Sequence, residues 1–329
     1  MKSTQPLVSV IIPCYNVEEF IFNTIKKITK QTYQNLEIIC IDDGSTDSTG
    51  VKLREVNEKY GISVYAQNNK GAALARKLGV DKAKGEYIVF IDADDYIENR
   101  AIEYSISYMN KNLNRVDSVV WEFHTTNGIT SKPFVIYEHE RVLDGQEAFL
   151  NTIGTWKITG MGVFKREIIK QAYNQYSFSS IDSYNSDEYI TRLIFLCCAS
   201  IATLKIKYFY YNNEASTTRK FSKGWLKVFQ TNELIKKLMK KEGVYKEYKL
   251  KIIDQQSTDV VKLYFGYRNN KSLMSASEKI EFSKECMKGV KSFSVLEYLS
   301  WCFWSRKKIK NKLGFIYSCM YFCLQRFVL

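Results

Sequence analysis

The chain has 329 residues, of which 45% are hydrophobic and 14% aromatic, a content that excludes a disordered protein and can fill a substantial core. Its 48 Lys and Arg outnumber its 35 Asp and Glu, and the formal charge of +13 favours an anionic partner such as nucleic acid, acidic lipid or a phosphorylated ligand. With only two histidines, His124 and His139, a His-built zinc site or a Ser-His-Asp triad is poorly supported.

The N-terminal residues and the cysteines both favour a cytoplasmic protein. The stretch MKSTQPLVSVIIPCYN has a short apolar segment that ends at Pro13, whereas a secretory signal has a charged start and a long apolar core. The eight cysteines lie mostly in apolar runs and lack the spacing of metal sites or secreted domains. We therefore expect reduced, buried thiols in a reducing compartment.

The first hundred residues alternate apolar runs with amphipathic stretches. Strands are predicted in LVSVIIP, LEIICIDDG, ISVYAQ and YIVFIDADD, with helices over residues 17–31, 47–60 and 71–83 between them. This order predicts a mainly parallel sheet with right-handed crossovers.

Carboxylates follow the last of these strands directly. Residues 87–91 predict a strand buried on both faces, and Asp92, Asp94 and Asp95 come next. Ligands bind at the carboxyl edge of open α/β sheets, where Asp oxygens suit Mg²⁺ or Mn²⁺ bridging to phosphates. Asp-rich turns also form for local reasons, so this motif alone leaves both interpretations open.

The pattern is weaker between residues 98 and 184, where SVVWEF, FVIYEH and MGVFKREII look like strands or strand-helix joins. Residues 187–196 predict a helix with one apolar face, and ATLKIKYFYYN predicts a strand after it. Residues 225–291 are Lys-rich and helical in pattern. We therefore expect strands and helices to about residue 211, and mainly helices from residue 225 to 291.

The segment from Phe293 onward places aromatic runs on both sides of RKKIKNK. Its last apolar run, residues 314–324, is shorter than the roughly 20 residues that a spanning helix needs. Aromatic residues beside Lys and Arg suit a helix in the headgroup layer of an anionic membrane. Docking on the protein's own core is the alternative, and no recognised RNA-binding motif accompanies the charge.

Four motifs in order, VSVIIPCYNVEEFI, IICIDDGSTDST, NNKGAALARKLGVDKAKGEYIVFIDADD and SDEYITRLIF, resemble the family-two glycosyltransferases. These are inverting enzymes with a GT-A fold that use nucleotide-sugars. The resemblance implies an α/β catalytic domain over about residues 1–220, with a nucleotide-sugar half of about 1–97 and an acceptor half of about 98–220. A basic helical region over residues 221–329 follows and is expected to associate with membrane.

The resemblance also assigns roles on the donor side. Tyr15 offers a flat face to a nucleobase, and Asp42 or Asp43 binds the uracil imide or a ribose hydroxyl, with Asp43 favoured as the base contact. Gly71 lets the backbone approach the ligand, and Arg76 directs positive charge toward the ribose or phosphates. The other donor-side candidates are Pro13, Asn16, Glu18, Asp92 and Ala93.

The metal, the phosphates and the acceptor complete the implied site. Asp94 would hold the Mn²⁺ or Mg²⁺ that clamps both phosphates, with Asp95 in support. Ser216, Thr217 and Arg219 are candidate phosphate contacts. Trp156 stacks on an acceptor sugar or belongs to the core, and both interpretations stay open.

An inverting transfer also needs a carboxylate that takes the proton of the acceptor hydroxyl. The motif aligns Asp187 as this base, with Ser186 where the family usually has Glu and with Glu188 next in line. This departure leaves the choice between Asp187 and Glu188 open. Acidic residues also favour the first turn of any helix, so this motif carries weight only together with the others.

Together these features predict a metal-dependent inverting glycosyltransferase that moves a sugar, expected from UDP, to a saccharide hydroxyl. A lipid-linked glycan in surface polysaccharide assembly is the expected acceptor, at an anionic membrane and without nucleic acid. A nucleotidyltransferase is the closest alternative, but PCYNVEEF is neither glycine-rich nor basic. The combination of Asp43, Asp92, Asp94 and Asp187 argues against a non-catalytic membrane or nucleic-acid binding protein.

Overall fold

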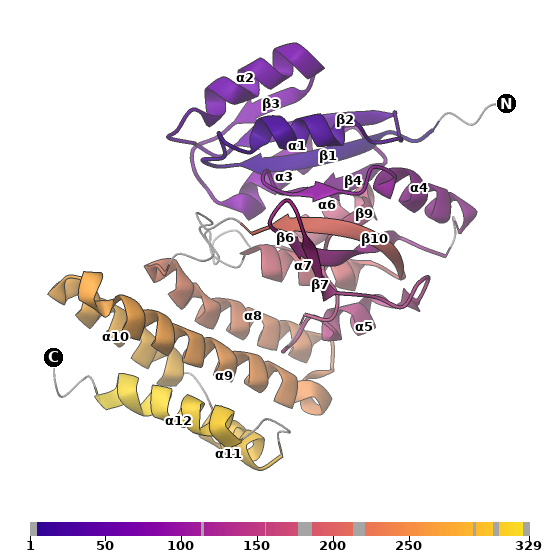
Figure 1. The fold of residues 1–329 in the computed structure, drawn as a ribbon. Coiled ribbons are helices and arrows are strands. Elements are labelled where there is room, and N and C mark those ends of the chain that lie inside the picture. The colour runs from indigo at the N-terminus through magenta and orange to yellow at the C-terminus, as the bar shows by residue number, and fades with distance from the viewer. Residues whose placement is uncertain are drawn as a thin grey trace. The chain divides into compact units, whose positions relative to one another are not determined.

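The structure is a computed structural model that describes residues 5–112, 115–154, 156–176, 186–212, 221–291, 294–304 and 309–324. The chain forms two compact units (Figure 1). The first comprises Met1–Thr152 and Trp156–Glu214, and the second comprises Ile153–Thr155 and Ala215–Leu329.

A ten-stranded sheet forms the centre of the first unit, in the order β3-β2-β1-β4-β9-β6-β10-β5, with β7 beside β6 and β8 beside β10. The strands are β1 (Val8–Cys14), β2 (Leu36–Asp42), β3 (Ser63–Ala66), β4 (Tyr87–Phe90), β5 (Tyr96–Ile97), β6 (Ser118–Thr126), β7 (Ser131–Val135), β8 (Val142–Leu143), β9 (Gly162–Lys165) and β10 (Ile201–Tyr211). Strands β3, β2, β1 and β4 are parallel, as expected. Strand β9 runs antiparallel to β4 and β6, so the whole sheet is mixed.

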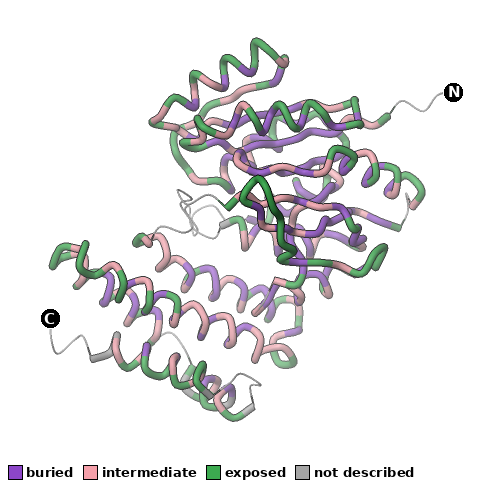
Figure 2. The backbone as a smooth tube through the Cα atoms, in the orientation of Figure 1, coloured by how far each residue is buried: buried purple, intermediate pink, exposed green. Residues whose placement is uncertain are grey.

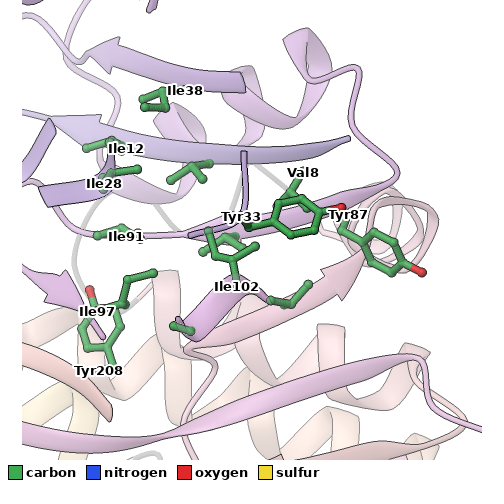
Figure 3. Packing of buried hydrophobic residues seen from close by; sticks show 14 of the residues in the cluster. Val8, Ile12, Ile28, Tyr33, Ile38, Tyr87, Ile91, Ile97, Ile102 and Tyr208 are labelled. Carbon is green, nitrogen blue, oxygen red and sulfur yellow. The ribbon is translucent and has the colours of Figure 1, made fainter. Parts of the chain in front are cut away.

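Helices cover both faces of this sheet. The described helices of the unit are α1 (Ile21–Ile28), α2 (Thr49–Tyr60), α3 (Ala72–Lys82), α4 (Ala101–Lys111), α5 (Gly145–Leu150), α6 (Arg166–Gln175) and α7 (Ser186–Cys197). On one face, Ile12 of β1 packs in the cluster that includes Ile28 of α1 and Ile102 of α4 (Figure 3). On the other, a Cβ added at Gly79 of α3 would lie 2.3 Å from Cγ2 of Ile11. Alternate residues of β1 therefore face opposite helical layers, which is why its sequence is apolar throughout.

The second unit is helical in its described part. It comprises η1 (Lys223–Lys227), α8 (Val228–Lys241), α9 (Tyr245–Asn270), η2 (Lys271–Leu273), α10 (Ala276–Lys291), α11 (Val295–Trp304) and α12 (Ile309–Leu324). Helix α9 contacts α8, α11 and α12, and α12 also contacts α10. Among the described helices, none combines the length and the apolar composition that crossing a membrane requires. The α/β class with a helical C-terminal region is thus confirmed.

Candidate active site

The loops that follow β1 and β2 are joined by hydrogen bonds. Asn16 has a φ of 52°, and its side-chain Oδ1 accepts a 2.8 Å hydrogen bond from the backbone N–H of Thr46. Glu18 Oε2 accepts one of 2.7 Å from the N–H of Ser48, just before α2. The side chains of Asn16 and Glu18 therefore hold one loop against the other, whatever further contact they make with a ligand.

Three other candidates lie at the same edge of the sheet. Pro13 pairs opposite Ile41 near the ends of β1 and β2, and the exposed Tyr15 follows it. Asp42 Oδ1 accepts a 2.9 Å hydrogen bond from the N–H of Ser45, which closes the turn after β2. Of these side chains, the ring of Tyr15 is the one presented to solvent.

Asp43 is buried and fixes the loop that precedes α3. Its Oδ1 accepts hydrogen bonds from Gln67 Nε2 at 2.7 Å and from the N–H of Lys70 at 2.8 Å. Its Oδ2 accepts a third, of 2.8 Å, from the N–H of Gly71, which has a φ of 86° that favours glycine. Asp43 thus sets the backbone path of the loop in which Gly71 is a candidate.

The Asp92–Asp95 loop is anchored by β10. The fully buried Asp95 accepts hydrogen bonds from the Tyr208 hydroxyl at 2.7 Å and from the N–H of Tyr211 at 2.8 Å, and the N–H of Asp92 donates to the Tyr208 hydroxyl. Burial and the nearby carboxylates of Asp92 and Asp94 raise the pKa of Asp95 well above its ordinary value, although its two hydrogen bonds lower it. Asp95 is therefore a buried anchor, beside two partly exposed carboxylates.

A second residue of this loop, Ala93, is held by α1. Ala93 is buried, and its carbonyl accepts a 2.7 Å hydrogen bond from the Thr24 hydroxyl. The Ala93 side chain thus belongs to the core, and any contact with a ligand would come from its backbone.

Arg76 brings the donor-side and base-side candidates together. This residue is 8% exposed, and its Nη2 lies 2.5 Å from Asp92 Oδ1. Burial lowers the pKa of Arg76, but the carboxylates of Asp92 and of Asp187 raise it by more, so it lies above its ordinary value. One buried guanidinium thus interacts with an acid after β4 and with an acid in the first turn of α7.

Glu188 and Trp156 share a different cation, Arg192. Arg192 is fully buried; its Nη1 contacts Glu188 Oε2 at 3.2 Å, and its Nη2 donates to the Thr152 carbonyl at 2.9 Å. Its guanidinium carbon lies 4.7 Å from the centre of the Trp156 ring, a cation–π contact. One face of the half-buried Trp156 is therefore covered. Asp187 is exposed, and no salt bridge in the described part of the chain holds it.

The carboxylates of Asp92 and Asp94 suit a hard divalent cation only when a bound ligand supplies further oxygens. Among the described residues, no group of three or more His, Cys, Asp or Glu side chains is placed to hold a metal. Asp92 and Asp94 lie close enough to Asp95 for both to act on its pKa. Phosphate oxygens and water would complete the six-oxygen shell that Mg²⁺ or Mn²⁺ prefers.

Sequence reasoning missed two residues that organise the site, and some of the residues that it named are not described by the structure. Arg192 stands four residues after Glu188 on a helix, and this spacing is a signal that could have identified it. Nothing in YFYY indicates that Tyr208, rather than a neighbour, anchors the Asp92–Asp95 loop. Ser216 and Arg219 lie outside the described residues.

The motifs can now be compared with known proteins. A family model described as glycosyl transferase family 2 matches residues 9–172. Glycosyltransferase GlyG of Streptococcus pneumoniae serotype 4 is 30% identical over 232 residues, which cover 67% of this chain and 75% of GlyG. The chain belongs to glycosyl transferase family 2.

Two further proteins are similar to this family-2 glycosyltransferase. The UDP-Glc:alpha-D-GlcNAc-diphosphoundecaprenol beta-1,3-glucosyltransferase WfaP of Escherichia coli is 41% identical over 103 residues, 31% of this chain and 41% of WfaP. The structure of S. aureus TarS 1–349 in complex with UDP-GlcNAc has a TM-score of 0.59 and 17% identity, over 97% of this chain and 81% of that one. The TarS likeness bears on the fold and confirms the expected GT-A type.

Proposed function

We propose that this glycosyltransferase transfers a sugar from a UDP-sugar to a saccharide hydroxyl with inversion. The observation that carries the proposal is Arg76, a buried cation that pairs with Asp92 on the donor side and whose pKa is also raised by the charge of Asp187 on the acceptor side. A displacement with inversion needs the leaving diphosphate and the base on opposite sides of the anomeric carbon. The two acids that interact with Arg76 supply one residue for each side.

The donor would lie along the edge formed by the ends of β1, β2 and β4. Tyr15 would stack on the base, and Asp43, which fixes the loop up to Gly71, would bind the uracil imide. Arg76 and Asp92 would lie toward the ribose and diphosphate. The UDP-GlcNAc bound in the similar TarS structure supports a UDP-sugar.

Asp94, with Asp92, would hold a divalent cation together with the diphosphate. Neutralisation of the leaving group's charge is the chemistry that Mg²⁺ or Mn²⁺ supplies when bound. Asp95 is excluded from this role because its oxygens face Tyr208 and the N–H of Tyr211.

Asp187 is the proposed base. Glu188 is held by the buried Arg192, so moving it toward an acceptor would break an ion pair and leave a buried cation without its partner. Asp187 is exposed on the same helical turn and interacts with Arg76. Asp187 can therefore accept the proton of the acceptor hydroxyl without breaking the ion pair between Glu188 and Arg192.

The proposed acceptor is a lipid-linked glycan in surface polysaccharide assembly. The face of Trp156 opposite Arg192 would stack on a sugar ring. The similarity to WfaP, a diphosphoundecaprenol-linked GlcNAc glucosyltransferase by name, supports this class. Such an acceptor would place the enzyme at the inner surface of the cell membrane.

A donor assay tests the proposal. Incubation with UDP-sugars and Mn²⁺ should give slow hydrolysis of one of them, and EDTA should stop it reversibly. Asp94→Asn should nearly abolish turnover with an unchanged melting temperature, because a neutral amide is a poor ligand for a hard cation. Activity that survives both EDTA and this substitution would refute the metal role, and hydrolysis of other nucleotide-sugars alone would refute UDP.

A further inference from the structure

Helices α11 and α12 form a hairpin whose inner faces are buried against α9. Tyr298 and Trp301 of α11 and Phe315 of α12 are each at most 8% exposed and pack with Ile253 of α9. The rings of Tyr298 and Phe315 stack with their centres 4.7 Å apart. These contacts hold α11 and α12 against their own unit.

The outer sides of both helices are also apolar, and they are exposed (Figure 2). We define the outer face by six side chains, each between 42% and 81% exposed: Leu296, Leu299, Phe303, Leu313, Ile316 and Met320. Within each helix they recur three, four or seven residues apart, so they share one side of it. Six of the seventeen exposed large hydrophobic residues in the described chain lie here, so these residues form a continuous apolar surface and are not scattered singly.

The sequence of the two helices and of the residues that flank them is strongly basic. From residue 295 to 329 it has one acid, Glu297, and six basic residues, namely Arg306, Lys307, Lys308, Lys310, Lys312 and Arg326. Glu297 Oε2 lies 2.8 Å from Lys236 Nζ, so this acid is already paired. Lys310 is exposed at the start of α12, whereas residues 305–308 and 325–329 lie outside the described residues. In the described part of α11 and α12, an exposed cation therefore accompanies the outer face, and the one acid is paired elsewhere.

We propose that the outer face docks on an anionic lipid surface, with α11 and α12 lying in the headgroup layer. Apolar side chains beside Lys and Arg are what such helices insert and pair with anionic headgroups. The described helices are unsuited to spanning, so the hairpin would lie along the surface. The inference does not depend on the proposed transfer reaction, because it rests on the second unit alone.

Removal of the whole tail is a poor test, since it would also expose Ile253 and the rest of the inner contact. Substitution of exposed side chains avoids this. Leu299→Ser, Phe303→Ser, Ile316→Ser and Met320→Ser are combined in one full-length variant. The matched control carries Ile129→Ser, Phe134→Ser and Ile136→Ser, which are also exposed apolar positions but lie in the first unit.

Co-sedimentation is measured with vesicles of phosphatidylcholine alone and of phosphatidylcholine mixed with phosphatidylglycerol. The wild type should bind the mixed vesicles, and high salt should weaken but not remove the binding. The fourfold variant should bind at least about 100-fold more weakly than the wild type, with an unchanged melting temperature. The control should bind like the wild type. Lys310→Glu, which keeps every apolar residue, should bind the mixed vesicles about 10-fold more weakly.

Three results would overturn the proposal. The wild type could fail to bind mixed vesicles, or the fourfold variant could bind as well as the wild type. The third is a lipid-free dimer that the fourfold variant abolishes, because the outer face would then contact a second copy. If the fourfold variant aggregates, the Lys310→Glu variant provides the test instead. Binding of this variant to mixed vesicles that equals wild-type binding would contradict the charge argument. Donor hydrolysis in the same samples is expected to be unaffected, so failure here is separable from failure of the proposed function.

Discussion

Asp187 and Glu188 are neighbours in the first turn of α7, yet the fold gives their carboxylates different surroundings. Glu188 contacts the fully buried Arg192, which also covers one face of Trp156. Asp187 is exposed and interacts with Arg76. Two identical functional groups one residue apart thus have different surroundings: Glu188 is held by a buried cation, and Asp187, the base that we propose, is exposed.

Asp187→Asn should lower kcat by roughly 10²-fold or more, with little change in the KM of the donor, because general-base catalysis acts in the transition state. Steady-state kinetics with a saccharide acceptor measure both constants. The expectation fails if the KM of the donor rises while kcat is kept.

Glu188→Gln is the matched control for this prediction. It removes the charge opposite Arg192, so it should lower the melting temperature while keeping more turnover than Asp187→Asn. If Glu188→Gln proves the more damaging change to kcat, the two roles must be exchanged.

At the residue scale, the motif shows that acids follow one strand, but it does not show which of them are buried in the fold. Asp92, Asp94 and Asp95 follow one strand, and the motif cannot tell that the last turns inward. That depends on Tyr208 and Tyr211, which lie more than a hundred residues later. Asn16 and Glu18 were likewise predicted as ligand contacts, and their hydrogen bonds to the neighbouring loop are visible only in the fold.

Among the elements, the starts of β6 and β10 and the end of β9 are tied together by one carboxylate, Asp117. Its Oδ1 lies 2.9 Å from Lys165 Nζ, and its Oδ2 accepts hydrogen bonds from the N–H groups of Ala199 and Ser200. Burial raises the pKa of Asp117, but the hydrogen bond from Lys165, those from the two N–H groups and the charge of Lys165 lower it by more. The pKa therefore lies below its ordinary value.

Asp117→Asn should lower the melting temperature at neutral pH by roughly 2–4 °C, for a loss of about 1 kcal/mol. A carboxyl whose folded pKa is depressed stabilises the protein above its unfolded pKa of about 4, and this contribution is lost as pH falls through the folded pKa. The difference between variant and wild type should therefore shrink in acid. Melting curves across that range test this, and a constant difference would contradict it.

Element boundaries follow from sequence pattern only where packing is local. The alternation of apolar runs and amphipathic stretches predicted β1 to β4 and the helices between them. A helix was expected from residue 17, whereas α1 begins at Ile21, after a turn in which the N–H groups of Phe20 and Ile21 donate to the Val17 carbonyl. FVIYEH was expected as a strand over 134–139, but β7 ends at Val135, and the Tyr137 hydroxyl accepts from the N–H of Thr159.

At the scale of the whole molecule, the chain order of the strands differs from their order in the sheet. Strand β10 pairs with β6 along its length, and it also pairs with β5 and β8. Sequence patterns do not show this, because the partners of β10 come from segments far apart in the chain. Strands were expected in this part of the sheet, but their pairing, with β10 parallel to β6 and antiparallel to β5 and β8, was not predicted.

A fragment of residues 1–200 should fail to fold, because it keeps β5, β6 and β8 but lacks their shared partner. Circular dichroism and urea denaturation of this fragment, beside the full-length chain, test the expectation. A cooperative transition like that of the intact protein would contradict it.

The position of β10 also bears on how the protein is made. A ribosome releases the chain from its N-terminus, so the Asp92–Asp95 loop emerges long before Tyr208 and Tyr211, which complete its anchoring. Until then, Asp95 lacks both hydrogen-bond donors and β5 remains an unpaired strand. While more than a hundred codons are translated, the nascent chain therefore has a loop without its anchor and a strand without its partner, and we expect chaperones to be needed most in this interval.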